Sequence, residues 1–218
     1  MANSKKSVAQ RLFVAEMAIK GTLNNPSILA AVSPFGYGQA RMEEGLALYR
    51  EAQLLTELKN KAYGAQMGAT TTVKRTREEA AVAYMAALKI ARVVFAGDES
   101  AQNALGLEGP RKKSLSGWLD QARRFYNNVL RTPEFLAVMT AYNYPQAKLT
   151  AEVALVEAVW VKSELQDKER GEAQRATKMR NVKLAALDRW VAAYKKVAEV
   201  ALAASPQDLE QLGWLVRS

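Results

Sequence analysis

The sequence predicts an all-α protein, a helical bundle built from a tandem duplication. Three observations indicate this fold class: an internal repeat at a constant offset, apolar residues at helical spacing, and prolines that directly follow N-cap residues. No segment alternates polar and apolar residues convincingly over the length of a strand. We therefore expect helices throughout, arranged as two copies of one unit.

The repeat is clearest in two stretches that share proline, aromatic, glutamine and alanine positions. PSILAAVSPFGYGQAR begins at Pro26, and PEFLAVMTAYNYPQAK begins 107 positions later, at Pro133. The same offset, without a gap, pairs further residues on both sides. Among these pairs are Leu12 with Leu119, Tyr37 with Tyr144, Gly64 with Gly171, and Leu105-Gly106 with Leu212-Gly213. We expect a first helical repeat over 1–107, a junction over 108–113 and a second repeat over 114–218.

Each copy is expected to begin with a helix, over 4–23 and 114–130, followed by a short helical turn. Asn25 and Thr132 stand directly before the prolines that open this turn, as N-cap residues do. Trp118 and Phe125 lie on one face of the helix in the second copy, at the spacing of a buried stripe. The apolar spacing therefore favours packing over a surface role for these aromatic residues.

The rest of each copy is expected to form a helical hairpin with a short closing helix. The long helices should span 39–63 and 72–95 in the first copy, and 146–170 and 179–202 in the second. Turns near Gly64 and Gly171 should reverse the chain. The closing helices, opened by Asp98 and Ser205, should end near residues 105 and 215. Apolar residues at helical spacing mark one face of the first long helix in each copy: Ala40, Ala47, Leu54 and Leu58, and then Ala147, Ala154, Val161 and Leu165.

Some positions hold a small residue in the first copy and a large residue in the second. At the repeat offset, Ala83 aligns with Trp190 and Ala87 aligns with Tyr194. Because protein cores are close-packed, such exchanges require compensation nearby. We therefore expect the copies to pack into each other as one pseudo-two-fold-symmetric multi-helix bundle, descended from a symmetric homodimer of the half-length unit.

Composition removes several kinds of chemistry. The chain of 218 residues contains no histidine and no cysteine, so the commonest general base, the commonest transition-metal ligand and every thiolate are missing. No glycine-rich phosphate loop and no pair of carboxylates at catalytic spacing stands out. We therefore expect a protein that is not an enzyme and that binds no cofactor and no metal.

Hydropathy indicates a cytoplasmic protein. The apolar positions of the N-terminal segment are interrupted by Gln10, Arg11, Glu16 and Lys20, which is not typical of a signal peptide. No uninterrupted apolar run is long enough to span a bilayer. We expect a monomer or a homodimer without a transmembrane segment.

The first candidate site is the start of the first long helix in each copy. It consists of Tyr37, Gln39 and Arg41, and of Tyr144, Gln146 and Lys148. Free N–H groups and a basic side chain at a helix start could bind a phosphate or carboxylate, with a tyrosine stacking on an attached ring. In the alternative interpretation the tyrosines cover the end of the bundle, the glutamines bond the loop backbone and the basic residues are solvated.

The second candidate site is a basic surface on the two hairpin tips. The formal net charge is +9, which favours nucleic acid, anionic lipid or an acidic protein as partner. The expected contact residues are Lys74, Arg75, Arg77, Arg175, Lys178 and Arg180. These cations could follow a phosphate backbone. Nearby acids such as Glu78 and Glu172 favour the alternative, a solvated face with charge pairs one helical turn apart.

Three functional hypotheses follow from these patterns. The first is a non-enzymatic binding or scaffolding protein with a protein partner of unknown identity, whose duplication doubles a contact surface or fuses a dimer. The second is a nucleic-acid-associated protein that uses the hairpin tips. The third is a carrier of an apolar ligand between the helices.

Overall fold

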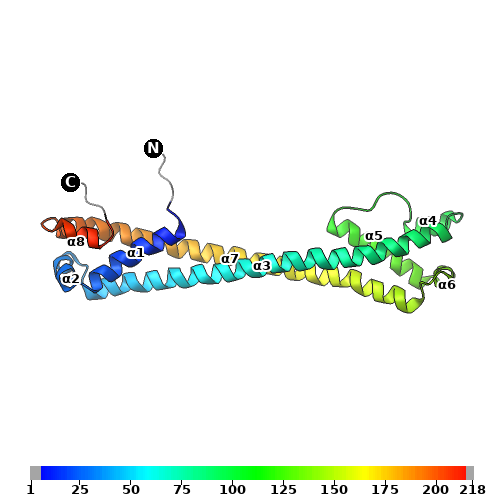
Figure 1. The fold of residues 1–218 in the computed structure, drawn as a ribbon, viewed down its shortest axis with the longest axis horizontal. Coiled ribbons are helices and arrows are strands. Elements are labelled where there is room, and N and C mark those ends of the chain that lie inside the picture. Colours follow the sequence, from blue (N-terminus) through cyan, green and yellow to red (C-terminus); the bar gives the residue numbers. More distant parts are fainter. Residues whose placement is uncertain (1–5, 215–218) are drawn as a thin grey trace. The chain divides into compact units, whose positions relative to one another are not determined.

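The computed structural model describes residues 6–214, and every regular element in this range is a helix. The elements are α1 (Val8–Leu23), α2 (Pro26–Val32), the 3-10 turn η1 (Ser33–Phe35), α3 (Gln39–Val94), α4 (Glu99–Leu105), α5 (Leu115–Arg131), α6 (Pro133–Ala141), α7 (Gln146–Ala201) and α8 (Pro206–Gln211) (Figure 1). The all-α prediction is confirmed for this part of the chain. Helix α1 begins at Val8, after the N-cap Ser7, rather than near Ser4, and α8 ends at Gln211 rather than near Leu215; Ser4 and Leu215 themselves lie outside the described residues.

The four helix starts predicted from N-cap residues are confirmed in position. The Asn25 side chain accepts hydrogen bonds from two backbone N–H groups at the start of α2, and the Asp98 side chain accepts one at the start of α4. Thr132 and Ser205 also occupy N-cap positions, before α6 and α8, but neither side chain makes a capping bond. Proline in the first turn begins both of these helices, because its fixed φ suits a helix start and its missing N–H needs no partner there.

The turns predicted near Gly64 and Gly171 are wrong. Helices α3 and α7 each continue without interruption for 56 residues, and the two glycines lie in their interiors. Glycine costs a helix only about 1 kcal/mol relative to alanine, and the surrounding alanine, lysine, glutamine and arginine residues favour helix. No proline stands in either segment to remove a backbone donor. The helical hairpins, and with them the hairpin tips, therefore do not form.

The chain divides into two compact units. Unit 1 takes Met1–Gly64 and Gly171–Ser218, of which the structure describes residues 6–64 and 171–214, and unit 2 takes Ala65–Arg170. Each unit thus combines a part of each predicted repeat, because α3 and α7 both pass from one unit into the other. The single bundle expected for the two copies stays a prediction.

Unit 1 contains α1, α2, the first part of α3, the second part of α7, and α8. Its core joins Ile19 and Ile28 to Met42, and these to Tyr194 and Leu212 from the other end of the chain. Figure 1 shows α1 running beside both long helices in this unit. The apolar faces of short helices are thus buried against segments that are distant in the sequence.

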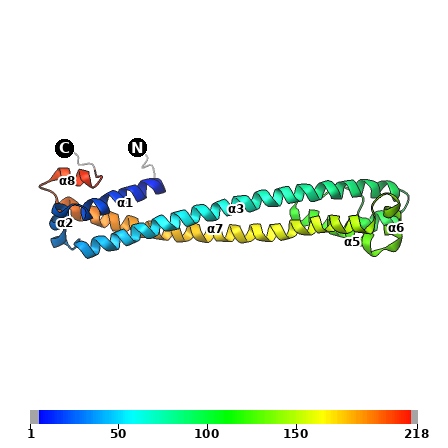
Figure 2. The same ribbon diagram turned by 60° about the horizontal axis from the view of Figure 1, so that its bottom comes forward.

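Unit 2 contains the second part of α3, α4, α5, α6 and the first part of α7. Tyr84 from α3 is fully buried against Phe125 and Tyr126 from α5, with Leu149 from α7 in the same core. Figure 2 shows α5 lying beside α3 and α7 at this end. Trp118 and Phe125 are buried here, as their spacing predicted.

The helix boundaries recur at the offset found in the sequence. Helices begin at Val8 and Leu115, at Pro26 and Pro133, at Gln39 and Gln146, and at Glu99 and Pro206, and every pair is separated by the repeat offset. The two long helices end at Val94 and Ala201, which are separated by the same offset. The two halves of the chain therefore have α-helices in the same order, with their starts at the same spacing.

Candidate functional site

Unit 2 buries one carboxyl group, that of Glu152, on the inner side of α7. This residue is 8% exposed, and the Tyr126 hydroxyl from α5 donates a hydrogen bond to its Oε2 at 2.9 Å. Burial raises the pKa of Glu152 above its ordinary value, although the Tyr126 hydrogen bond and the charge of Lys148 both act to lower it. Burial and the nearby carboxyl also raise the pKa of Tyr126 and that of Tyr144. These groups therefore hold their protons more tightly than they would in water.

Arg111 ties the junction between the halves of the chain to the same core. Its Nη1 donates to the Tyr84 hydroxyl at 2.9 Å and to the Gly106 carbonyl oxygen at 3.1 Å. Its Nη2 donates to the carbonyl oxygens of Glu108 and Gly109. Neither Arg111 nor Glu152 was a candidate from the sequence, because their partners lie on other elements. Both residues make hydrogen bonds within unit 2, and no group of three acidic side chains within residues 6–214 is placed to bind a metal ion.

Unit 1 has a glycine, rather than a buried acid, at the position that corresponds to Glu152. At the repeat offset that position is Gly45, and the Trp190 ring fills the space beside it, 2.5 Å from where an added Cβ would lie. The residue that corresponds to Trp190 is Ala83 in unit 2. One unit therefore packs a large ring against a glycine, while the other buries a hydrogen-bonded acid.

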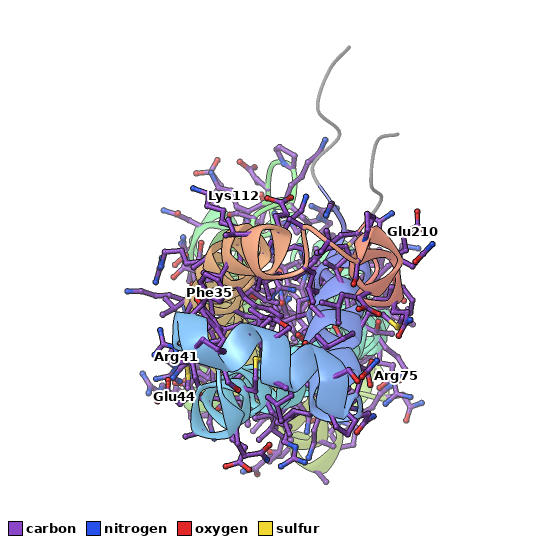
Figure 3. All side chains as sticks on the ribbon, turned by 90° about the vertical axis from the view of Figure 1, so that its left-hand side faces the viewer. Phe35, Arg41, Glu44, Arg75, Lys112 and Glu210 are labelled. Carbon is purple, nitrogen blue, oxygen red and sulfur yellow. The ribbon has the colours of Figure 1, made fainter. Side chains whose placement is uncertain are left out.

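The first copy of the predicted helix-start site is occupied by contacts within the protein. Tyr37 is 8% exposed and belongs to the core of unit 1. The Gln39 amide donates to Glu43 and the Arg41 guanidinium donates to Glu44, each at 2.6 Å. Figure 3 shows Arg41 and Glu44 next to each other on the outside of α3. The tyrosine therefore has a packing role, while the glutamine bonds a side chain rather than the loop backbone.

The second copy of this site lies in unit 2. The Lys148 ammonium lies 3.6 Å from the centroid of the Tyr144 ring and donates to the Asn143 carbonyl oxygen at 3.3 Å. Gln146 is exposed at the first position of α7. Each copy thus brings its own tyrosine and basic residue together, whereas the two sets belong to different units.

The six predicted nucleic-acid contacts are mid-helix residues rather than residues of a tip. Lys74, Arg75 and Arg77 belong to α3 in unit 2, and Arg175, Lys178 and Arg180 belong to α7 in unit 1. Three of them have partners within the chain: Arg75 forms an ion pair with Glu79 at 3.9 Å, Arg77 donates to the Lys113 carbonyl oxygen at 2.8 Å, and Arg180 donates to the Asn181 side chain. Three of these residues therefore belong to each unit.

Helix α7 carries a second apolar face, which lies outside the core of unit 2 and ends at Leu165, beside Ala65 and Ala69 of α3. We call it the outer face of α7 and define it as Ala147, Ala151, Ala154, Ala158, Val161 and Leu165. Leu149, Val156 and Val159 form the buried face of the same segment. Val161 is 56% exposed and Leu165 is 43% exposed. The face predicted from the sequence therefore exists, but a different face of the helix fills the core.

Helix α3 repeats this arrangement in unit 1. Leu54 is 54% exposed and Leu58 is 47% exposed, and Ala40 and Ala47 continue the same face toward the start of the helix. On α7 the alternating spacings of four and three residues are typical of a surface that packs against another helix, whereas the apolar residues named on α3 are seven, seven and four residues apart. Exposed apolar residues of this size in one row mark an interaction site more often than single exposed leucines do.

Comparison with protein-family models, curated proteins and solved structures finds no match to this chain. Within residues 6–214, no helix combines the length and the apolar character that a membrane span requires.

Proposed function

We propose that the protein is a non-enzymatic scaffolding protein that binds an amphipathic helix of a partner protein along the outer face of α7. The observation that carries this proposal is the row of exposed apolar residues that ends in Val161 and Leu165. The opposite face of the helix already supplies the core of unit 2, so this row contributes nothing to that core. An apolar row on a long helix offers the anchor positions that a partner helix needs.

Charges along the two edges of the outer face indicate what the partner helix should carry. Lys148 and Lys162 lie along one edge, and Glu157 and Glu164 lie along the other. Arg123 already pairs with Glu157 through two hydrogen bonds of 2.6 and 2.8 Å, which leaves Glu164 as the freer acid. The matching partner is an apolar helix with acidic residues on one flank and a basic residue on the other, as in paired coiled-coil helices.

We further infer that the chain is a tandem duplication with pseudo-symmetric halves. The recurrence of the α-helix starts at the repeat offset supports this inference. Each unit combines the first part of one copy with the second part of the other, as two half-length chains would if they exchanged the ends of their long helices. Fusion of such a dimer makes its assembly independent of concentration and supplies two outer faces, on α3 and on α7.

The docking proposal is tested with a fluorescent, designed peptide of about six turns: an Ala/Leu heptad helix with one acidic and one basic flank. Anisotropy should report saturable binding that Val161→Glu weakens by about tenfold or more, equivalent to about 1.4 kcal/mol, because a charge enters the apolar row. The matched control is Val82→Glu, since Val82 is 74% exposed on α3 outside either outer face. Equal affinity for both variants, or no binding by the parent protein, would contradict the proposal.

The nucleic-acid hypothesis stays a prediction, and the same instrument tests it. Several phosphate contacts would make the affinity for mixed DNA and RNA probes fall by about 10³-fold or more between about 50 and 200 mM salt. Such binding, lost in Arg175→Gln but retained in Val161→Glu, would replace the docking proposal with the nucleic-acid one.

A further inference from the structure

Unit 1 contains a groove of about 550 Å³ between α1 and the second part of α7. Its floor is apolar and consists of Val14, Val191, Ala192 and Trp214. The Trp214 ring packs edge-on against Tyr194, with 5.6 Å between the ring centroids, so its position is fixed by the core. A volume of this size is typical of pockets that hold small organic molecules.

The rim of the groove is positively charged. Arg11 and Asp188 both line the groove and form a bidentate ion pair, in which Nε donates to Oδ1 at 3.1 Å and Nη2 donates to Oδ2 at 2.5 Å. Their charges therefore cancel. Lys6 and Lys195 remain on the rim as cations. Lys195 has a carboxylate partner, Glu199, at 3.5 Å, but both side chains are about half exposed, and such surface pairs are weak. The groove therefore offers two ammonium groups above an apolar floor.

We propose that this groove binds a small amphipathic anion from solution, a molecule with an aliphatic or aromatic body and a carboxylate or sulfonate head. The body covers the floor, where Val14, Val191 and Trp214 exclude water from it. The head lies at the rim, where Lys6 and Lys195 donate charge-assisted hydrogen bonds. The chemistry of the groove carries this inference, which is independent of helix docking because the outer face of α7 belongs to unit 2.

The test is a titration of the whole protein with 8-anilinonaphthalene-1-sulfonate, a fluorescent amphipathic anion, followed by competition with octanoate and 1-octanol. Octanoate should displace the dye at a concentration about tenfold lower than octanol does, because only octanoate carries the charge that the lysines bind. Lys195→Gln should weaken dye binding by about tenfold, while Lys196→Gln, at the next position of the same helix, should leave it unchanged.

A second pair of variants tests the position of the site. Ala192→Trp fills the groove and should abolish displaceable dye binding, whereas Ala193→Trp introduces the same ring at an exposed neighbouring position outside it. A thermal melt checks that both variants fold. Equal dye binding by the two tryptophan variants, equal displacement by octanoate and octanol, or no displaceable binding by the parent protein would overturn the proposal.

Discussion

Gly45→Ala should lower the free energy of unfolding by about 1–3 kcal/mol, the usual cost of overpacking a core. A Cβ at this position would lie 2.5 Å from Cη2 and Cζ2 of Trp190, well inside contact distance. The tryptophan ring is 7% exposed and packs against Tyr37 and Tyr194, so it cannot move aside without disturbing both. Urea denaturation followed by circular dichroism measures the change.

The matched controls are Gly64→Ala and Gly171→Ala. Nothing lies within 4 Å of an added Cβ at either position, and both glycines are in helix interiors. Each substitution should therefore raise the free energy of unfolding by about 0.5–1 kcal/mol. If Gly64→Ala lowered the free energy of unfolding while Gly45→Ala did not, α3 would not be a continuous helix packed against Trp190.

Tyr126→Phe should destabilise the protein by about 1–3 kcal/mol at neutral pH, because it leaves the buried carboxyl of Glu152 without its hydrogen-bond donor. The same substitution at Tyr142, which is 54% exposed, should change stability little. Chemical denaturation at neutral pH compares the two variants. A loss of stability at Tyr142 equal to that at Tyr126 would contradict the role assigned to the buried pair.

The same carboxyl should give stability a defined pH dependence. Burial raises the pKa of Glu152 in the folded state. Its contribution to the free energy of unfolding is therefore largest when the carboxyl is protonated in both states, at pH values below its ordinary pKa of 4.5. This contribution decreases as the pH rises through the raised, folded-state pKa. Glu152→Gln keeps the acceptor for Tyr126 without the charge, so it should be more stable than the parent protein at neutral pH and no more stable near pH 4.5. If the stability that Glu152→Gln gains over the parent protein increased toward acidic pH, the result would contradict the raised pKa of Glu152.

Local sequence predicts where the helices start better than where they end. Asn25, Asp98 and the prolines at the starts of α2 and α6 define their helices because the cap contacts lie within one turn. Gly64 misleads, since a glycine is compatible both with a turn and with a helix interior. The choice between the two depends on packing along the whole of α3, which a local pattern does not contain.

The sequence shows apolar helical faces without showing which of them is buried. Leu54 and Leu58 have the spacing of core residues, yet they are about half exposed, while Ala52 and Leu55 on a neighbouring face are buried. Only the structure identifies which of the two apolar faces meets the core. The burial of Glu152 could not be predicted from a local pattern, because its hydrogen-bond partner Tyr126 lies on another helix. The one signal for it was the exchange of Gly45 for Glu152 between the copies.

The combination of both halves of the chain in each unit can be tested most directly by zero-length carbodiimide cross-linking of the monomeric fraction, followed by peptide mass spectrometry. In unit 1 the Lys183 ammonium lies 2.8 Å from a carboxylate oxygen of Glu51, so these residues should become joined. The pair Lys20 and Glu16, 2.5 Å apart within α1, is the internal positive control. If α3 instead turned back at Gly64, Glu51 would become joined to lysines of residues 72–95. That product, formed without the link from Glu51 to Lys183 while the control link appears, would contradict the continuous helices and the units built from them.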